Sequence, residues 1–372
     1  MKIFVVGTRG IPDIPGGVET HCQELYPRIA AAGHEVTLAT RISYVREKRK
    51  NWEGVSLKHV YAPRRKSLEA LVHTFLAAIF GRNSRPDLIH VHAIGPSLLV
   101  PFMRLLGMKV VMTNHGPDYE RGKWGFLAKK ILFLGEYWGG KYANEVIVIS
   151  SVIGDIVKKR CNRESNLIYN GVNLPEKATK TNILEQHGIL PGQYILAVAR
   201  LVPEKGLHDL IEAFTKITGD QQLVIAGDAD HETTYSRDLK KKAAVDSRVV
   251  MTGYITGEYL RQVFSHARLF VLPSYHEGLP IALLEAMSYN LAPLISDIPA
   301  HLEVDLPEHC YFRCGDVAHL QSRLEKALNA ENDKQEPVDY RSIVAEKYNW
   351  DDIVQQTIAV YGKVLQSGSS LK

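Results

Sequence analysis

The sequence has 372 residues, of which 45% are hydrophobic and 23% charged. This composition excludes a disordered or fibrous chain, and the length exceeds what one hydrophobic core usually serves. Four scattered cysteines exclude a disulfide framework and favour a reducing, cytoplasmic setting. The net charge of +4 is unevenly divided, because residues 1–168 carry 25 Lys and Arg against 14 Asp and Glu, whereas the remainder carries 20 against 27. A basic first half is typical of attraction to an anionic surface.

The first elements predict a parallel sheet. Residues 2–6 form an apolar run, 7–17 a loop rich in Gly and Pro, 18–32 a helical pattern closed by glycine, and 34–39 a second strand. Further strands are expected at 87–91, 109–114 and 145–150, with an apolar helix at 68–80. No apolar stretch reaches the roughly 20 residues that a bilayer span needs, and the first apolar run is too short for a signal peptide.

The same rhythm begins again after residue 170. Strands are expected at 194–199, 222–226, 248–252, 269–272 and 292–296, and helices at 207–217, 257–266 and 281–289. We therefore expect two doubly wound domains, 1–168 and 169–349, with a final helix in 350–372 crossing back to the first. Ligands are expected where loops leave the carboxyl ends of both sheets, in a cleft between the domains.

The loop that contains Gly16 and Gly17 joins a strand to a helix N-terminus, where backbone N–H groups and the helix dipole favour an anion. It lacks the spacing of a dinucleotide fingerprint and of a P-loop. A glycine-rich turn without a ligand is the alternative.

Two cations stand at the mouth of a strand-to-helix loop in the second domain. Arg200 follows the strand at 194–199, and Lys205 precedes the next helix. Such a pair neutralises a diphosphate, and a leaving nucleoside diphosphate needs that compensation. Two solvated surface cations are the alternative.

The most informative segment is 272–280, where a strand leads Glu277 into a tight turn and Pro280 suits the first helical position. Glu285 follows on the helix. Ionised carboxylates accept strong hydrogen bonds from hydroxyls, so the two residues point to a sugar-containing ligand. A first-turn glutamate and a solvated one are the alternative.

These residues carry a resemblance. Glu277 and Glu285 at this spacing, with Arg200 and Lys205 upstream and two glycines in the first loop, resemble the retaining glycosyltransferase family 4, which has the GT-B fold of two Rossmann-like domains facing a cleft. The first loop is similar to that of bacterial transferases building surface polysaccharides, including rhamnosyltransferase-like members.

The resemblance implies a metal-independent transfer from a nucleoside-diphosphate sugar with retention of anomeric configuration and without a cofactor. Its residue roles are also implied. Arg200 and Lys205 would hold the diphosphate, Glu277 the donor sugar and Glu285 the ribose. Backbone N–H groups of Gly278 and Leu279 would add to the phosphate site, and Gly16 and Gly17 would approach it from the other domain.

Two further positions follow from the same resemblance. His115 comes directly after the strand at 109–114, where the family has a histidine that contacts the donor sugar near the reacting carbon. A histidine that merely caps a strand end is the alternative. Tyr254 lies where relatives hold the nucleobase through backbone groups, so the base is not readable from the sequence.

No metal site is expected. Asp228 and Asp230 imitate a metal-binding D-x-D but follow a Rossmann strand, and Cys310 and Cys314 with His309 lack a second ligand pair. No nucleic-acid module is present.

Basic residues flank aromatic ones in the first half, at 64–66 before the helix at 68–80 and at 123–130. They suit an anionic membrane interface at the inner face of the cell membrane. Helices that pack on the sheet with solvated Lys and Arg are the alternative.

The sequence thus predicts a glycosyltransferase acting on a saccharide or lipid-diphosphate-linked acceptor in bacterial glycan synthesis. Two alternatives are a non-catalytic regulatory protein that binds a nucleotide sugar and a sugar-nucleotide epimerase. Donor sugar, base, acceptor, linkage and oligomeric state depend on loop shapes that motifs do not reveal.

Overall fold

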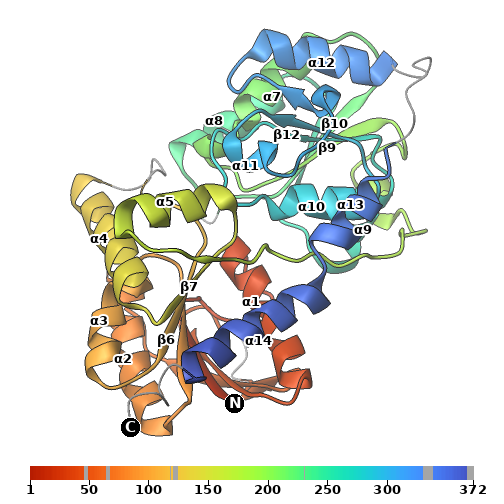
Figure 1. The fold of residues 1–372 in the computed structure, drawn as a ribbon. Coiled ribbons are helices and arrows are strands. Elements are labelled where there is room, and N and C mark those ends of the chain that lie inside the picture. The colour runs from red at the N-terminus through yellow and green to blue at the C-terminus, as the bar shows by residue number, and fades with distance from the viewer. Residues whose placement is uncertain are drawn as a thin grey trace. The chain divides into compact units, whose positions relative to one another are not determined.

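The computed structural model describes residues 1–45, 49–63, 68–117, 119, 125–229, 231–329 and 338–366. The chain divides into two compact units (Figure 1). Unit 1 comprises Met1–Gly171 and Trp350–Lys372, and unit 2 comprises Val172–Asn349. Among the described residues, no helix has the length and apolarity needed to cross a membrane.

Unit 1 is built on an eight-stranded sheet in the order β3-β4-β2-β1-β5-β6-β7-β8. All neighbours pair in parallel except β3 and β4. The strand order reverses between β1 and β5, which makes that position the switch point of the sheet. The strands are β1 (Lys2–Val6), β2 (Glu35–Arg41), β3 (Asn51–Trp52), β4 (Val55–Val60), β5 (Leu88–His92), β6 (Val110–Asn114), β7 (Glu145–Val148) and β8 (Asn166–Leu167).

The helices of unit 1 form two groups. The helix α14 packs against α1, and Trp350 and Tyr361 of α14 join the core that contains Tyr26 of α1 and Val5 of β1. The other helices include α2, η1, α3 and α4, which contact one another in series. Their bounds are α1 (Gly17–Ala31), α2 (Glu69–Ser84), η1 (Pro96–Leu99), α3 (Val100–Leu105), α4 (Phe126–Tyr142), α5 (Ser151–Cys161) and α14 (Trp350–Gln366).

Unit 2 has a six-stranded parallel sheet in the order β11-β10-β9-β12-β13-β14, with its switch point between β9 and β12. The strands are β9 (Tyr194–Val198), β10 (Gln222–Ala226), β11 (Val249–Gly253), β12 (Leu269–Leu272), β13 (Pro293–Ser296) and β14 (Tyr311–Phe312). The helices are α6 (Asn182–Gln186), η3 (Pro203–Lys205), α7 (Leu207–Thr215), α8 (Thr234–Ala243), α9 (Gly257–Ser265), α10 (Ile281–Ser288), α11 (Pro299–Leu302), η4 (Glu308–Cys310), α12 (Val317–Asn329) and α13 (Tyr340–Lys347).

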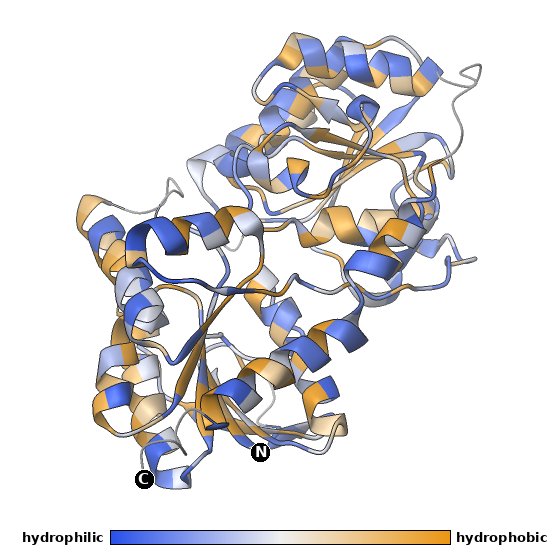
Figure 2. Ribbon diagram, viewed as in Figure 1, coloured by the Kyte–Doolittle hydropathy of each residue, from blue (hydrophilic) through white to orange (hydrophobic). Residues whose placement is uncertain are grey.

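The sequence pattern explains these elements. The central strands β1, β9 and β12 are almost continuous apolar runs, as expected for strands covered on both faces. The helix α7 places Leu207, Leu210, Ile211 and Phe214 on one buried face. Figure 2 shows the hydrophobic residues concentrated in the sheets and the inner faces of the helices.

The observed architecture confirms the expected pair of doubly wound sheets, and each expected strand is present within two residues of its predicted ends. The strands β3, β4, β8 and β14 were not predicted. Of these, β4 carries a signal, because Val55 and Leu57 alternate with the exposed Ser56 and Lys58 as in a half-buried strand.

Candidate functional site

The loops after β9 and β12 meet at the switch point of unit 2. Gly206 has a φ of 62°, and a Cβ there would collide with the carbonyl oxygen of Pro273, so the β9 loop approaches the β12 loop at a position that requires glycine. The N–H of Tyr275 donates to the carbonyl of Glu204 at 2.9 Å. These contacts hold the two loops together at the carboxyl ends of adjacent parallel strands, where open sheets bind ligands.

The structure brings Lys205 and Glu277 into direct contact at this position. The Lys205 Nζ donates to Glu277 Oε1, and their side chains are only 18% and 10% exposed. The Ser274 hydroxyl donates to the same carboxylate oxygen at 2.8 Å. Two donors on one oxygen fix the orientation of the carboxylate.

The environment keeps Glu277 ionised. Burial opposes the charged form, but the Lys205 ammonium, the nearby His301 and the hydrogen bonds from Lys205 and Ser274 hold the pKa of Glu277 below its ordinary value. His301 is fully buried, and burial lowers its pKa to about 4 despite the opposing effect of Glu277. Its Nε2 has no hydrogen-bond partner among the described residues, so His301 is a second polar group beside Glu277. Neither His301 nor Ser274 was among the site residues predicted from the sequence.

The segment between Glu277 and α10 differs from the sequence prediction in one respect. Pro280 is the N-cap of α10 and not its first helical residue, because its ψ of 97° is extended. Gly278 is partly buried and Leu279 is 5% exposed, so both precede the N-terminus of α10 in a loop anchored by an apolar side chain.

The remaining predicted residues of unit 2 are spread along the same sheet edge. Arg200 follows β9 and is partly buried, and Glu285 lies on α10 with partial exposure. Tyr254 follows β11 and is 55% exposed.

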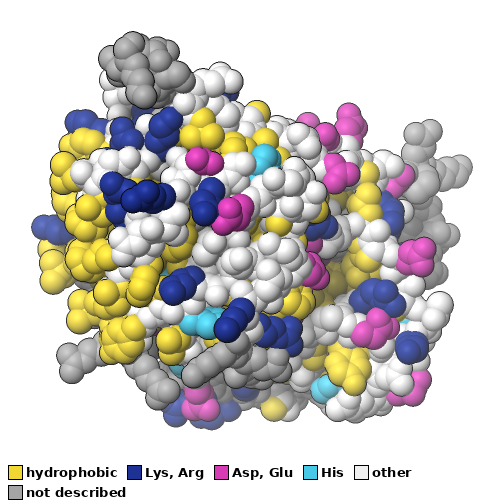
Figure 3. Space-filling view, turned by 90° about the horizontal axis from the view of Figure 1, so that it is seen from below, with side chains coloured by type: hydrophobic (Ala, Val, Ile, Leu, Met, Phe, Trp, Pro, Cys, Tyr) yellow, Lys and Arg dark blue, Asp and Glu magenta, His cyan; other side chains and the backbone are white. Residues whose placement is uncertain are grey.

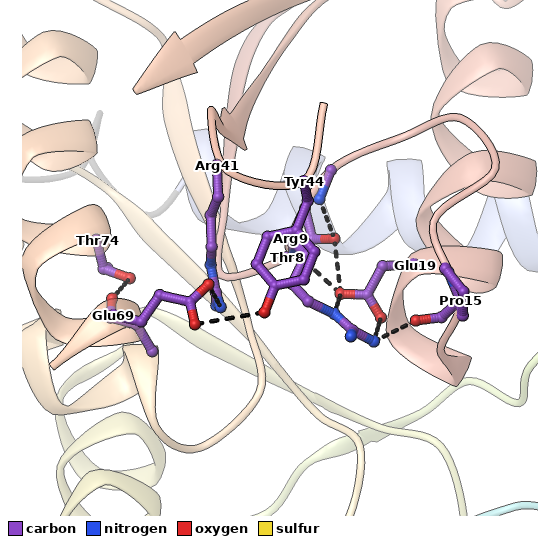
Figure 4. Close-up of polar contacts among 10 residues, drawn as sticks. Thr8, Arg9, Pro15, Glu19, Arg41, Tyr44, Glu69 and Thr74 are labelled. Atoms are coloured by element: carbon purple, nitrogen blue, oxygen red, sulfur yellow. Dashed lines mark hydrogen bonds and ion pairs between the residues drawn. The ribbon is translucent and has the colours of Figure 1, made fainter. Parts of the chain in front are cut away.

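In unit 1, Gly16 and Gly17 stand at the N-terminus of α1, with Gly16 as N-cap at a φ of 142°. A Cβ at Gly16 would collide with the side chains of Glu19 and Arg9, so this position requires glycine. The carboxylate of Glu19 accepts from the Arg9 backbone N–H at 3.0 Å and from its Nε at 3.1 Å (Figure 4). The Glu19 carboxylate therefore already accepts a backbone N–H of the loop that was predicted from the sequence as an anion site.

A second arginine–carboxylate pair lies nearby in Figure 4. Arg41 at the end of β2 contacts Glu69 at the start of α2 at 3.1 Å, and the Tyr44 hydroxyl donates to Glu69 at 3.4 Å. The Arg9 guanidinium lies 5.4 Å from the Tyr44 ring centroid, which links the two pairs. This group was not predicted from the sequence because its members come from separate helices, strands and loops.

His115 directly follows β6 and is partly buried. Its Nε2 is 2.9 Å from Nδ1 of His92, the last residue of β5. Burial, followed by the effect of His90, lowers the pKa of His115 to about 3, so the ring is neutral at pH 7.

Basic and apolar side chains share the outer surface of α4. Phe126 and Leu127 are 76% and 71% exposed, and Lys129 and Lys130 are exposed beside them. At the left of Figure 3, on the side where α3 and α4 lie in Figure 1, hydrophobic side chains gather next to lysines and arginines. The predicted basic run 64–66 and residues 123 and 124 lie outside the described residues.

The rejected metal motifs have other partners. Asp228 pairs with Lys240 at 2.9 Å, and Asp230 lies outside the described residues. Cys310 is buried with its Sγ 3.5 Å from the Tyr340 hydroxyl. Within the described parts of the chain, no three His, Cys, Asp or Glu residues are grouped as a metal site.

Two doubly wound sheets in tandem are the architecture of the GT-B class of glycosyltransferase, and a solved glycosyltransferase structure shares this fold. Residues 15–176 match the model of glycosyltransferase family 4, and residues 179–342 match that of the glycosyl transferases group 1. The two models together cover most of the chain, and the chain belongs to the glycosyltransferases that they describe.

Three similar proteins agree with this assignment. An uncharacterized glycosyltransferase of Methanocaldococcus jannaschii is 28% identical over an alignment of 392 positions, gaps included, which covers 97% of this chain and 98% of that protein. A putative teichuronic acid biosynthesis glycosyltransferase of Bacillus subtilis is 27% identical over 230 residues, 58% of this chain and 54% of that protein. The Anabaena HepE structure in complex with UDP and glucose has a TM-score of 0.79 at 16% identity, covering 97% of this chain and 99% of that one, and thus shares the fold.

Proposed function

We propose that this glycosyltransferase moves a hexose-type unit from a nucleoside-diphosphate sugar to a saccharide or lipid-diphosphate-linked acceptor, with retention of configuration. The observation that carries the proposal is the buried contact of Lys205 and Glu277 at the switch point of unit 2. A cation and an oriented carboxylate at that position match the two ends of an activated sugar, its diphosphate and its hydroxyls.

The family resemblance supplies the donor roles in this proposal, and the position of Lys205 and Glu277 supports them. Arg200 and Lys205 bind the diphosphate, Glu277 binds hydroxyls of the transferred sugar, and Glu285 binds the ribose. The N–H groups of Gly278 and Leu279 add donors at the N-terminus of α10. The loop at Tyr254 holds the base through its backbone. The UDP and glucose in the similar HepE structure support a nucleotide-sugar donor.

Unit 1 supplies the acceptor site and one residue for the reaction. The arginine–carboxylate pairs of Arg9 and Arg41, with Tyr44 between them, offer charged donors and acceptors for sugar hydroxyls at the carboxyl edge of the sheet. The backbone at Gly16 and Gly17, at the N-terminus of α1, is the part of unit 1 that the family resemblance assigns to the donor phosphate. The relative named as a putative teichuronic acid biosynthesis glycosyltransferase supports a polysaccharide acceptor.

The chemistry needs no divalent ion in this proposal. The bond between the anomeric carbon and the diphosphate oxygen breaks, and the acceptor hydroxyl forms the new bond on the same face. The acceptor proton passes to the leaving diphosphate. Arg200 and Lys205 neutralise the charge that develops on that group, and His115, a neutral dipole, stabilises the positive charge on the sugar.

A transfer assay tests the proposal. The protein is incubated with a panel of nucleotide sugars, each alone and with a lipid-diphosphate-linked saccharide, with and without EDTA. We expect nucleoside diphosphate release only with acceptor, a product anomer identical to that of the donor by NMR, and no effect of EDTA. Epimerised donor without acceptor would identify an epimerase, and binding without turnover would identify a regulatory protein.

We further propose that the outer surface of α4 contacts the anionic inner face of the cell membrane. Phe126 and Leu127 are exposed apolar anchors, and the Lys130 Nζ lies 4.4 Å from the Phe126 ring centroid, so charge and apolar surface are adjacent. The excess of basic residues in 1–168 has the sign that anionic lipids attract.

Co-sedimentation with vesicles tests this surface. Reversing Lys129 and Lys130 to Glu should weaken binding to phosphatidylglycerol vesicles by about 10-fold or more, since each lysine near the surface contributes about 1 kcal/mol. Reversing Lys240 and Lys241 on α8 makes the same charge change elsewhere and should have little effect. Equal losses of vesicle binding in both variants would contradict the proposal. Wild-type binding to vesicles of pure phosphatidylcholine that is as strong as binding to phosphatidylglycerol would contradict it too.

A further inference from the structure

Three histidines, two on β5 and one directly after β6, are packed together in unit 1. His90 and His92 are both fully buried, with ring centroids 4.3 Å apart, and the His92 and His115 centroids are 5.2 Å apart. His21 of α1 lies 5.2 Å from His115 by the same measure. Such a group is unusual because imidazoles are costly to bury unless their nitrogens are paired.

Hydrogen bonds connect these rings in one chain. His115 Nε2 lies 2.9 Å from His92 Nδ1, and His92 Nε2 contacts the Tyr26 hydroxyl. The same hydroxyl lies 2.9 Å from His90 Nδ1. Both ring nitrogens of His92 are therefore occupied, one by His115 and one by Tyr26.

The far end of the chain is anchored on two elements. His90 Nδ1 is 2.7 Å from the Tyr361 hydroxyl of α14, and His90 Nε2 is 2.7 Å from the Thr113 hydroxyl of β6. The chain thus runs from the end of β6 through β5 and α1 to the last helix. A Cβ on Gly7 would collide with the His92 carbonyl, so the β1 loop packs on the same residue.

Each ring in this chain is neutral at pH 7. Burial lowers the pKa of His90 and of His115 to about 3, and that of His92 falls well below its ordinary value for the same reason. A neutral imidazole has one N–H and one lone pair. Because each hydrogen bond holds a single proton, the tautomer of one ring fixes the tautomer of the next.

We propose that His92 is a positioning residue for His115. Its Nδ1 engages Nε2 of His115, which fixes the orientation and the tautomer of that ring and leaves Nδ1 of His115 as the nitrogen that faces substrate. The proposal rests on the proposed function, in which His115 acts on the transferred sugar. A ring that is free to rotate or to exchange tautomers would present the correct atom only part of the time.

Two substitutions at His92 separate this role from simple packing. An asparagine amide occupies the place of Nδ1, so His92→Asn keeps the contact with His115 and loses the one with Tyr26. A glutamine amide reaches the place of Nε2, so His92→Gln keeps Tyr26 and loses His115. We expect His92→Gln to lower kcat by about 10- to 100-fold with little change in the donor KM, and His92→Asn to recover most of that loss.

Thermal unfolding of both variants is the control. Equal activity in the two variants, or losses of activity that follow their losses in Tm, would show that His92 only fills space and would overturn the proposal.

A spectroscopic measurement is independent of turnover. Nitrogen-15 NMR of histidine-labelled protein reports which ring nitrogen carries the proton. We expect a single His115 tautomer in the wild type and in His92→Asn, and an averaged mixture in His92→Gln. A single unchanged tautomer in His92→Gln would overturn the positioning role. Full activity of His115→Ala would instead overturn the proposed function of His115, whatever the NMR result.

Discussion

Replacing Glu277 by glutamine should reduce the turnover of the transferase by about 10²- to 10³-fold, the range typical of removing one charged contact to a transition state. Glutamine has nearly the same shape and still accepts from Ser274, but it carries no charge. The pKa of Glu277 is held low by Lys205 and His301, so the native residue is ionised at pH 7 and the substitution removes a full negative charge. Steady-state rates with a saturating acceptor measure the effect.

The control must account for Lys205, whose charge loses its partner in that variant. Unpaired buried charges destabilise a protein, so a lower Tm is expected for Glu277→Gln. The double variant Lys205→Met with Glu277→Gln restores charge balance and should recover stability but not activity. Glu212→Gln on α7, an exposed carboxylate paired with Lys216, should keep full turnover. Turnover of Glu277→Gln within about tenfold of wild type, below the expected loss, would contradict the assigned role.

Unit 1 should lose stability steeply in mild acid. Burial lowers the pKa of His21, His90 and His115 to about 3, and that of His92 also falls well below its ordinary value, whereas an unfolded chain binds these protons near pH 6.5. The unfolded state therefore takes up more protons below pH 6.5, and the free energy of unfolding falls as the pH falls. Each histidine contributes about 1.4 kcal/mol per pH unit once the pH is well below 6.5, and the four together on the order of 4 kcal/mol between pH 6.5 and 5.5.

Urea unfolding at pH 7.5, 6.5 and 5.5 measures this effect. All four tryptophans, at positions 52, 124, 138 and 350, belong to unit 1, so their fluorescence reports unit 1 alone. Unit 2 is the internal control. Among its described residues burial lowers the pKa of one histidine, His301, so its stability should depend far less on pH. The urea midpoint measured by fluorescence should fall sharply as the pH falls. Circular dichroism reports both units, and the part of its transition that does not coincide with the fluorescence change, which we assign to unit 2, should shift far less. A fluorescence midpoint that is constant over this range would contradict the prediction.

Much of the fold was predictable because its signals are local. The strand β1 is a run of five residues with one clear end at Gly7, and α7 repeats apolar residues at helical spacing. The strand β4 was missed because its alternating pattern is short and its main partner, β2, lies earlier in the chain. The assignment of Pro280 as the first helical residue was wrong by one position, a difference that backbone angles alone decide.

The candidate site was predictable only where one segment carries a motif. Glu277 and Lys205 were recognised from separate motifs, but their contact depends on the adjacent positions of β9 and β12 in the sheet. His92 gave no sequence signal beyond alternating with His90 along a strand. Its role depends on the pairing of β5 with β6, which brings its ring to His115.

The most direct test of the account follows a labelled sugar from donor to acceptor. Wild-type protein and Glu277→Gln are incubated in parallel with a nucleotide sugar labelled in its sugar ring and a lipid-diphosphate-linked saccharide. We expect the wild type to place one labelled sugar on the acceptor for each nucleoside diphosphate released, and the variant to place almost none. Nucleoside diphosphate release without label on any acceptor, or equal labelling by the two proteins, would contradict the account.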